Sequence, residues 1–170
     1  MDANPSSDAI DDVVNDLRRW RPDLEAVGLP ITGRVLRLAQ YLTIGREQRL
    51  AEFGLTVADF DVLATLRRRA SAESVNVGDL QHAMMLSSSG VTKRLDRLET
   101  AQLIERHPDP NDRRGVLIRL SQTGLDLIDR VVVAITVFEN DAVSGAINSD
   151  EERLQLETGL RRMLIAHERA

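Results

Sequence analysis

The residues best suited to recognise another molecule lie between positions 87 and 100 of this 170-residue sequence. Val91, Leu95 and Leu98 recur at i, i+4 and i+7, which predicts a helix with one apolar side. The opposite side would present short hydroxyl groups at its beginning and long basic side chains further along. Such a face suits DNA, because hydroxyl groups and cations hydrogen-bond to base edges and phosphates. The candidate DNA contacts on this face are Ser87, Ser88, Ser89, Thr92, Lys93 and Arg97.

A second basic feature is the pair Arg113 and Arg114, in a segment rich in proline, asparagine and glycine at positions 108–115. The flanking runs 103–107 and 116–120 are β-prone, so they predict a hairpin with a basic tip. A tip of this kind can reach a minor groove. Each feature alone is commonly an ordinary solvated surface, but the helix and the tip together favour DNA binding.

Arg94 and Arg106 suggest a different chemistry. Arg94 lies three residues after Val91 and four before Leu98, so it borders the apolar side of the predicted helix, and Arg106 lies in the strand that follows. Inward-facing arginines need an anion or a carboxylate, because an unpaired buried charge is costly. Asp61 is a natural partner within the protein, and a small anionic ligand is the alternative. A structural ion pair of Asp61 with either arginine is the more ordinary interpretation.

Catalytic and metal-binding patterns are missing from the sequence. It contains no cysteine, which excludes disulfides, thiolate metal sites and cysteine redox sensing. His82, His107 and His167 lack the spacing of metal ligands, and neither a Ser-His-Asp set nor a phosphate-binding loop has plausible spacing. The sequence therefore predicts a protein that is not an enzyme and has no cofactor or metal.

The net charge of −5 seems at first to argue against DNA binding. The acidic excess lies near the two ends, whereas residues 31–120 carry 14 basic and 11 acidic side chains. Phosphate contacts depend on local cations, so the sign of the net charge does not exclude DNA binding. The most apolar run, 131–137, is too short to span a membrane, and the first residues do not resemble a secretory signal, so a cytoplasmic protein is expected.

The elements that must position these residues are mostly helical. Aliphatic residues at helical spacing, N-cap residues and breakers predict seven helices and one hairpin. Thr56 with Asp59 and Ser149 with Glu152 are candidate capping boxes, and Ser121 is a further N-cap. The predicted helices cover residues 10–19, 30–53, 57–66, 76–83, 87–100 and 121–147, and a last helix from 149 carries Leu156, Leu160, Met163 and Leu164. Short helices followed by a hairpin with a charged tip predict a mainly α (α+β) winged helix-turn-helix.

The segments 103–106 and 109–121 resemble the strand, wing, strand and helix cap of the MarR family of transcriptional regulators. Asp112 and Arg114 match the family's Asp-x-Arg motif, in which this pair orders the wing. The similarity extends from about Pro30 to the C-terminus. One departure is Gln102, where the family usually has glycine; a left-handed conformation there would cost about 1 kcal/mol.

The resemblance implies a homodimer that binds double-stranded DNA at a pseudo-palindromic site. It also implies a division of the chain. Residues 1–29 would be an N-terminal extension with a short helix, 30–54 and 121–170 a helical dimerisation region, and 55–120 the winged helix-turn-helix DNA-binding region.

The segments 19–24, 59–63 and 86–98 resemble a narrower, urate-responsive (PecS-like) group within this family. Matched to that group's motifs, the ligand-binding positions are Trp20, Asp61, Arg94 and Arg106. A flat, anionic, hydrogen-bonding ligand such as urate suits two guanidinium groups and an indole. The alternative for Trp20 is a purely structural anchor of the N-terminal helix.

The resulting hypothesis is a DNA-binding repressor whose operator binding is weakened by a small anion such as urate. Arg94 shares its helix with Lys93 and Arg97, so a ligand that pulls on Arg94 and Arg106 would shift the DNA-binding helix. Two alternatives remain. One is a winged-helix DNA-binding or interaction protein without a small-molecule response, and the other senses a different aromatic or polycarboxylate anion.

Overall fold

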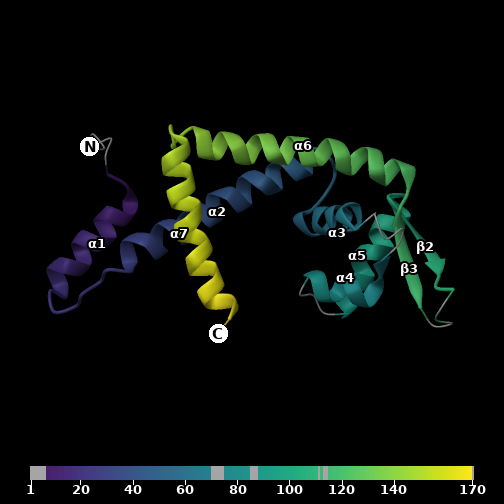
Figure 1. Cartoon of the computed structure of the whole chain (residues 1–170), viewed down its shortest axis with the longest axis horizontal. Helices are drawn as coiled ribbons and strands as arrows, with labels where there is room; N and C mark the ends of the chain where they lie inside the picture. The colour runs from purple at the N-terminus through teal and green to yellow at the C-terminus, as the bar shows by residue number, and fades with distance from the viewer. Residues whose placement is uncertain (1–6, 70–74, 85–87, 111, 113–114, 170) are drawn as a thin grey trace. The chain divides into compact units, whose positions relative to one another are not determined.

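The computed structural model describes residues 7–69, 75–84, 88–110, 112 and 115–169, with the backbone alone at 81–84 and 88–89. Within these residues the chain is mostly helical and carries one small antiparallel sheet (Figure 1). It divides into two compact units, 1–45 and 46–170, with the boundary inside a helix. The elements are α1 (Ala9–Trp20), α2 (Leu29–Ala51), α3 (Val57–Arg68), β1 (Val75–Asn76), α4 (Val77–Met84), α5 (Ser88–Thr100), β2 (Ile104–Pro108), β3 (Val116–Leu120), α6 (Gln122–Ser144) and α7 (Asp150–Glu168).

In the first unit, α1 docks on the beginning of α2 through one arginine. Asp8 caps α1 and forms a capping box with Asp11. The Arg34 guanidinium of α2 donates to the carboxylates of Asp8 and Asp11, each at 2.7 Å. Gly33 allows the close approach, because a Cβ there would lie 3.1 Å from Cγ2 of Ile10. The predicted short N-terminal helix and its end before Pro22 are confirmed.

We expect the docking of α1 to depend on pH and on Arg34. The pKa of Asp8 is lowered chiefly by the hydrogen bond from Arg34, and that of Asp11 by the backbone N–H of Asp8 and then by Arg34. A carboxyl whose pKa is lowered by docking stabilises the docked state above its ordinary pKa and loses this contribution as the pH falls. Hydrogen-exchange protection of α1 should therefore decrease below about pH 4. In Arg34→Ala it should already be low at pH 7, and unchanged protection would contradict this.

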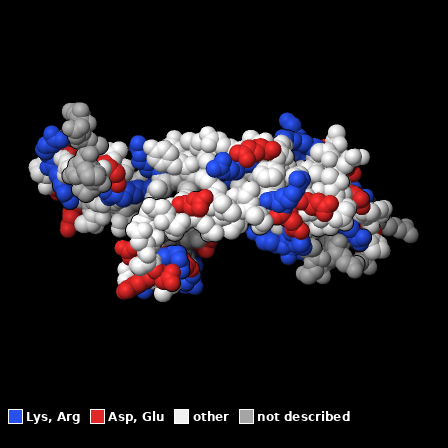
Figure 2. Space-filling view, turned by 90° about the horizontal axis from the view of Figure 1, so that it is seen from above, with Lys and Arg blue, Asp and Glu red and all other residues white. Residues whose placement is uncertain are grey.

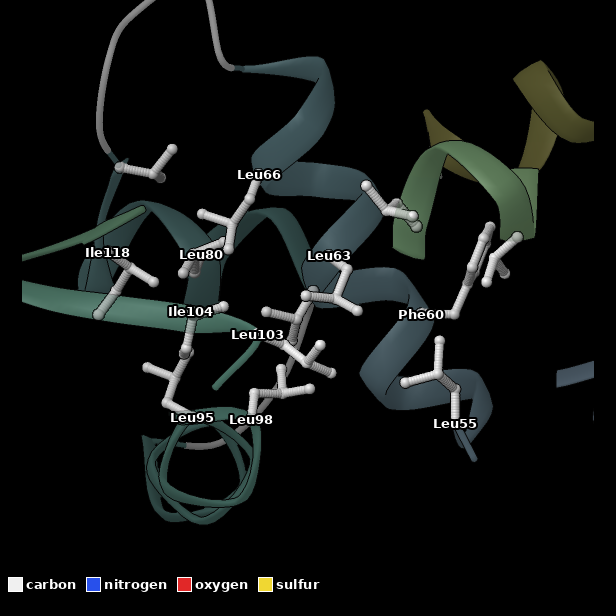
Figure 3. Packing of buried hydrophobic residues seen from close by; sticks show 14 of the residues in the cluster. Leu55, Phe60, Leu63, Leu66, Leu80, Leu95, Leu98, Leu103, Ile104 and Ile118 are labelled. Atoms are coloured by element: carbon white, nitrogen blue, oxygen red, sulfur yellow. The ribbon is translucent and has the colours of Figure 1, made fainter. Parts of the chain in front are cut away.

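The core of the second unit lies between α3 and the sheet. Leu63 and Leu66 of α3 are directed toward Ile104 and Ile118, which come from β2 and β3 (Figure 3). Leu95 and Leu98 close the core from α5. Burial of these aliphatic side chains is the main stabilising contribution, since each fully buried one contributes about 2 kcal/mol. The rest of the cluster includes Leu50, Leu55, Phe60, Val62, Val75, Leu80, Val91, Leu103, Ile128, Val131 and Ile135.

Local signals place the ends of several helices. Thr56 and Asp59 form the predicted capping box at the start of α3, and Gly54 follows the end of α2 with φ +70°. Gln102 has φ 57°, so the residue that replaces the family's glycine does adopt the left-handed conformation after α5. Ser121 caps α6 by accepting from the N–H of Gly124 at 3.0 Å.

The sheet has the strand order β1-β3-β2, with both pairs antiparallel. The predicted hairpin is confirmed, with Arg106 opposite Ile118 and Pro108 opposite Val116. The short strand β1, in which Val75 pairs with Ile118, was not expected from the sequence. It links the segment before α4 to the hairpin.

The last two helices differ from the prediction in their details. α6 ends at Ser144, where the chain turns through Gly145, and not near Ile147. At Ser149 the hydroxyl accepts from the N–H of Glu152 at 3.2 Å, which is one half of the predicted capping box. α7 buries none of its residues within the single chain, although it carries the leucines predicted for its apolar side. Among the described helices, none is both long and apolar enough to cross a membrane.

Candidate nucleic-acid interface and anion site

As predicted, one side of helix α5 is buried in the core and the opposite side is exposed to solvent. Val91, Leu95 and Leu98 are buried, whereas Thr92 and Lys93 are exposed. Lys93 has no acidic partner in the described part of the chain, so its charge is available to a phosphate. The backbone of Ser88 and Ser89 begins the helix, but their side chains, and Ser87, Arg113 and Arg114 as a whole, lie outside the described residues.

The base of the wing is a tight turn. The N–H of Gly115 donates to the carbonyl of Asp112 at 2.9 Å, and the N–H of Asp109 donates to the carbonyl of Gly115 at 3.0 Å. A Cβ on Gly115 would lie 2.8 Å from Cβ of Asp109, so a larger residue would force this turn open. These bonds therefore close the hairpin between Asp109 and Gly115. The pairing of Asp112 with Arg114 stays a prediction.

The Arg97 side chain, which was predicted to contact DNA, forms an ion pair and a hydrogen bond within the protein. Its Nη2 lies 3.3 Å from Oδ2 of Asp59 and donates to the carbonyl oxygen of Gly54 at 3.4 Å. The Asp59 side chain is only 2 % exposed, whereas that of Arg97 is 54 % exposed. The sequence predicted that Asp59 belongs to a capping box but not that it forms an ion pair with Arg97.

Arg106 is also held within the protein. Its guanidinium lies 2.6 Å from the Asp96 carboxylate and 3.1 Å from that of Glu99, both on α5. The Arg106 side chain is 29 % exposed, and its ion pairs join β2 to α5. The sequence had suggested an unpaired inward charge at Arg106, and the structure does not show one. A ligand anion at Arg106 must therefore compete with two carboxylates.

The other predicted ligand residues are not brought together by contacts of their own. Arg94 and Asp61 are both half-buried, and in the described ranges neither has a hydrogen bond or an ion pair. The expected pairing of Asp61 with Arg94 or Arg106 is thus not seen. Trp20 is the exposed last residue of α1, in the first unit. The ligand role of Arg94 stays a prediction.

An open cleft of about 660 Å³ lies beside Arg106. Its walls come from the end of α5, from β2 and from the beginning of α6. Glu105 lines it together with His107, whose Nε2 lies 3.1 Å from the Glu105 carboxylate. Acidic groups therefore border this cleft alongside Arg106 and disfavour an anion deep within it.

A second cavity, of about 480 Å³, lies within the second unit and was not anticipated. Arg46 of α2 extends over the Phe60 ring, 5.0 Å from its centroid, and its buried Nε lacks a hydrogen-bond partner. The nearby pair Arg67 and Asp129 is mutually satisfied: their hydrogen bond raises the pKa of Arg67 and lowers that of Asp129. Glu139 lies 3.9 Å from Arg46, beyond hydrogen-bonding distance. An apolar wall beside a guanidinium whose Nε has no hydrogen bond suits an aromatic carboxylate, although the anion would have to compete with Glu139.

Charges on the surface are mixed. On the face shown in Figure 2, acidic and basic side chains are interspersed, and much of the middle is uncharged. No cluster of histidine and acidic residues in the described ranges could hold a metal ion.

Comparisons with known proteins agree with this architecture. The family model described as the MarR family matches residues 55–116. The chain is 34 % identical over 154 residues to the HTH-type transcriptional regulator PecS of Dickeya dadantii, covering 91 % of this chain and 92 % of that protein.

Two solved structures share the fold. One is AbsC, a MarR family transcriptional regulator from Streptomyces coelicolor, with a TM-score of 0.74 at 24 % identity, covering 86 % of this chain and 98 % of that one. The other is a mutant MarR from E. coli complexed with operator DNA, with a TM-score of 0.67 at 24 % identity, covering 83 % and 99 %.

The hairpin and the three helices before it form a winged-helix fold, as in these two structures, and the similarity to PecS and to the MarR family model makes the protein a DNA-binding transcription regulator. With the similarity to PecS over nearly the whole chain, the assignment is specific: this chain belongs to the MarR family.

Proposed function

We propose that this protein binds a pseudo-palindromic DNA site as a homodimer and represses transcription until a small anion releases it. The observation that carries the DNA-binding part is Lys93, an exposed cation without a described acidic partner on the outer face of α5. Ser87, Ser88, Ser89 and Thr92 would approach base edges in the major groove beside it. Arg113 and Arg114 would reach the minor groove from the wing. The related MarR of E. coli has been crystallised with operator DNA, which supports this geometry.

A second copy of the chain is the proposed partner. Leu154, Leu156, Leu160 and Leu164 are exposed on α7 in the single chain. An open cleft of about 560 Å³ between α6 and α7 is lined in part by Leu156 and Leu160. Several exposed leucines on one helix, beside an open cleft, support an interface at this place. We therefore assign residues 30–54 and 121–170 to dimerisation, residues 55–120 to DNA binding and residues 1–29 to an extension.

The decisive experiment is titration of the purified protein into a labelled duplex from its own upstream region, followed by fluorescence anisotropy. Binding should be sequence-specific and should weaken steeply with salt, by about 0.9 in log K per log salt for each phosphate contact. Absence of specific binding at low salt would favour a protein used only for interaction.

For the effector we propose a planar anion such as urate, bound by Trp20, Asp61, Arg94 and Arg106. Arg94 is a half-buried cation without a described partner, and Arg106 is tied to the DNA-binding helix through Asp96 and Glu99. An anion that draws Arg106 away from these carboxylates would loosen the link between β2 and α5. The ligand and the DNA would then be coupled through one helix.

Urate is expected to weaken operator binding by about tenfold, which is a typical coupling between two sites. Arg94→Ala should bind the operator normally but lose this response, because its side chain makes no described hydrogen bond or ion pair on which the fold would depend. The measurement is the same anisotropy titration with and without urate. A response that survives in Arg94→Ala would show that the anion binds elsewhere.

The cavity beside Arg46 is the alternative location. If another aromatic or polycarboxylate anion is the effector, Arg46→Gln should abolish the response, because it removes the guanidinium over Phe60, whose Nε has no hydrogen bond. Arg94→Ala should then leave it intact. If no anion weakens operator binding, and neither substitution changes it, the protein is a winged-helix regulator without a small-molecule response.

A further inference from the structure

We propose that Arg97 is a positioning residue, which holds the DNA-binding helix in place through Asp59, and that it does not contact a phosphate. Its Nη2 lies 3.3 Å from Oδ2 of Asp59, at the start of α3, and 3.4 Å from the carbonyl oxygen of Gly54, after the end of α2. One guanidinium thus connects α5 to the turn that joins α2 to α3. This inference rests on the proposed DNA binding of α5.

The burial of Asp59 makes this contact costly to break. Its Oδ2 accepts from the N–H of Thr56 at 2.9 Å and from the Thr56 hydroxyl at 2.7 Å, so its hydrogen bonds also define the start of α3. Arg97 is the cation within 4 Å of this carboxylate in the described part of the chain. If Arg97 moved to a phosphate, a nearly fully buried carboxylate would lose its counter-charge, which is strongly unfavourable.

The backbone conformation of the turn between α2 and α3 orients the acceptor for Arg97. Gly54 has φ +70°, and its carbonyl oxygen faces Arg97. Leu55, the next residue, is buried in the core and donates its N–H to the carbonyl of Leu50 at 3.0 Å. The turn is therefore anchored independently of α5. Through Arg97, this anchored turn restrains the rotation and position of α5, on which Lys93 must meet the DNA.

The test compares four variants with the unmodified dimer by anisotropy over a series of salt concentrations. Arg97→Gln and Asp59→Asn each break the ion pair from one side, and the double variant breaks it from both. Asparagine at position 59 keeps an oxygen that can accept from Thr56. Lys93→Gln, one turn earlier on the same helix, is the matched control for loss of a phosphate contact.

If Arg97 positions α5, Arg97→Gln and Asp59→Asn should each lower operator affinity by about tenfold, and the double variant should lose no more than either alone. Their salt slopes and their affinities for unrelated DNA should stay unchanged. Lys93→Gln should instead reduce the slope by about 1.8 for the dimer. A reduced slope in Arg97→Gln, or tighter binding by Asp59→Asn, would overturn the proposal, because both are expected of an arginine that contacts phosphate.

A measurement without DNA separates this inference from the proposed function. Hydrogen exchange of the α5 backbone should become faster in Arg97→Gln and Asp59→Asn and stay unchanged in Lys93→Gln. Unchanged exchange in the first two variants would contradict the positioning role even if DNA binding is confirmed. Lack of DNA binding by the unmodified protein would contradict the proposed function, while faster exchange would still support the restraint of α5 by Asp59.

Discussion

Replacement of Gly124 by alanine is expected to lower the free energy of unfolding by about 3 kcal/mol, near the upper end for an added methyl group in a filled site. A Cβ at this position would lie 1.9 Å from the carbonyl oxygen of Leu103 and 2.9 Å from its carbonyl carbon. Both atoms belong to the backbone, so a rotamer change cannot relieve the clash. The same oxygen accepts from the N–H of Ser121 at 3.1 Å, and this bond would be strained as well.

Chemical denaturation at a fixed protein concentration measures this effect, since dimerisation would otherwise change the apparent stability. Gly159→Ala in α7 is the matched control, because a Cβ there meets nothing within 4 Å in the chain. Alanine in a helix is better than glycine by about 1 kcal/mol, so the control should gain stability. An equal change in both variants would show that close contact with Leu103 is not what makes position 124 sensitive.

The contrast between these glycines shows what the sequence can and cannot predict. Helix ends follow from hydrogen bonds between neighbouring residues, so the capping box of Thr56 and Asp59 and the cap at Ser121 were predictable. The same is true of Gln102, whose left-handed backbone follows from the need to end α5 sharply. The apolar period likewise predicted the buried side of α5. These features are local.

Contacts between distant segments were not predictable. The strand β1 has two residues and exists because Val75 meets Ile118, which lies far along the chain. The approach of Gly124 to Leu103 depends on how α6 leaves the hairpin. The alternation of apolar residues says which side of a helix is buried, but not which acidic side chain an exposed arginine will find. For this reason Arg97 was predicted as a DNA contact, although the structure pairs it with Asp59.

The ion pairs of α5 also explain how an acidic protein can present a DNA-binding helix. Asp96 and Glu99 are engaged by Arg106, and Arg97 is engaged by Asp59. These charges are paired within the protein and hold the helix between α3 and β2. Lys93 is exposed without a described acidic partner, so it contributes a net positive field where DNA would approach. The charges around α5, and not the net charge of −5, therefore determine whether this helix can approach DNA.

The double variant Leu160→Glu with Leu164→Glu is expected to be monomeric and to bind the operator at least about a hundredfold more weakly. Both leucines are exposed on α7, which buries none of its own residues in the single chain. In the proposed dimer they would be covered by the second copy, and a carboxylate there would have to give up its water. Operator affinity should fall with dimerisation, because two linked half-site contacts bind far more tightly than one.

Sedimentation and anisotropy together measure both parts of this prediction. The control is Gln155→Glu with Arg162→Gln, which makes the chain more acidic by the same two charges without touching the leucines of α7. It should remain dimeric and lose only the part of its affinity that depends on overall charge. A monomer that binds the operator as tightly as the unmodified protein would mean that one α5 is sufficient. If the leucine variant stays dimeric, the interface does not lie on α7, because two buried carboxylates per chain are too costly to tolerate.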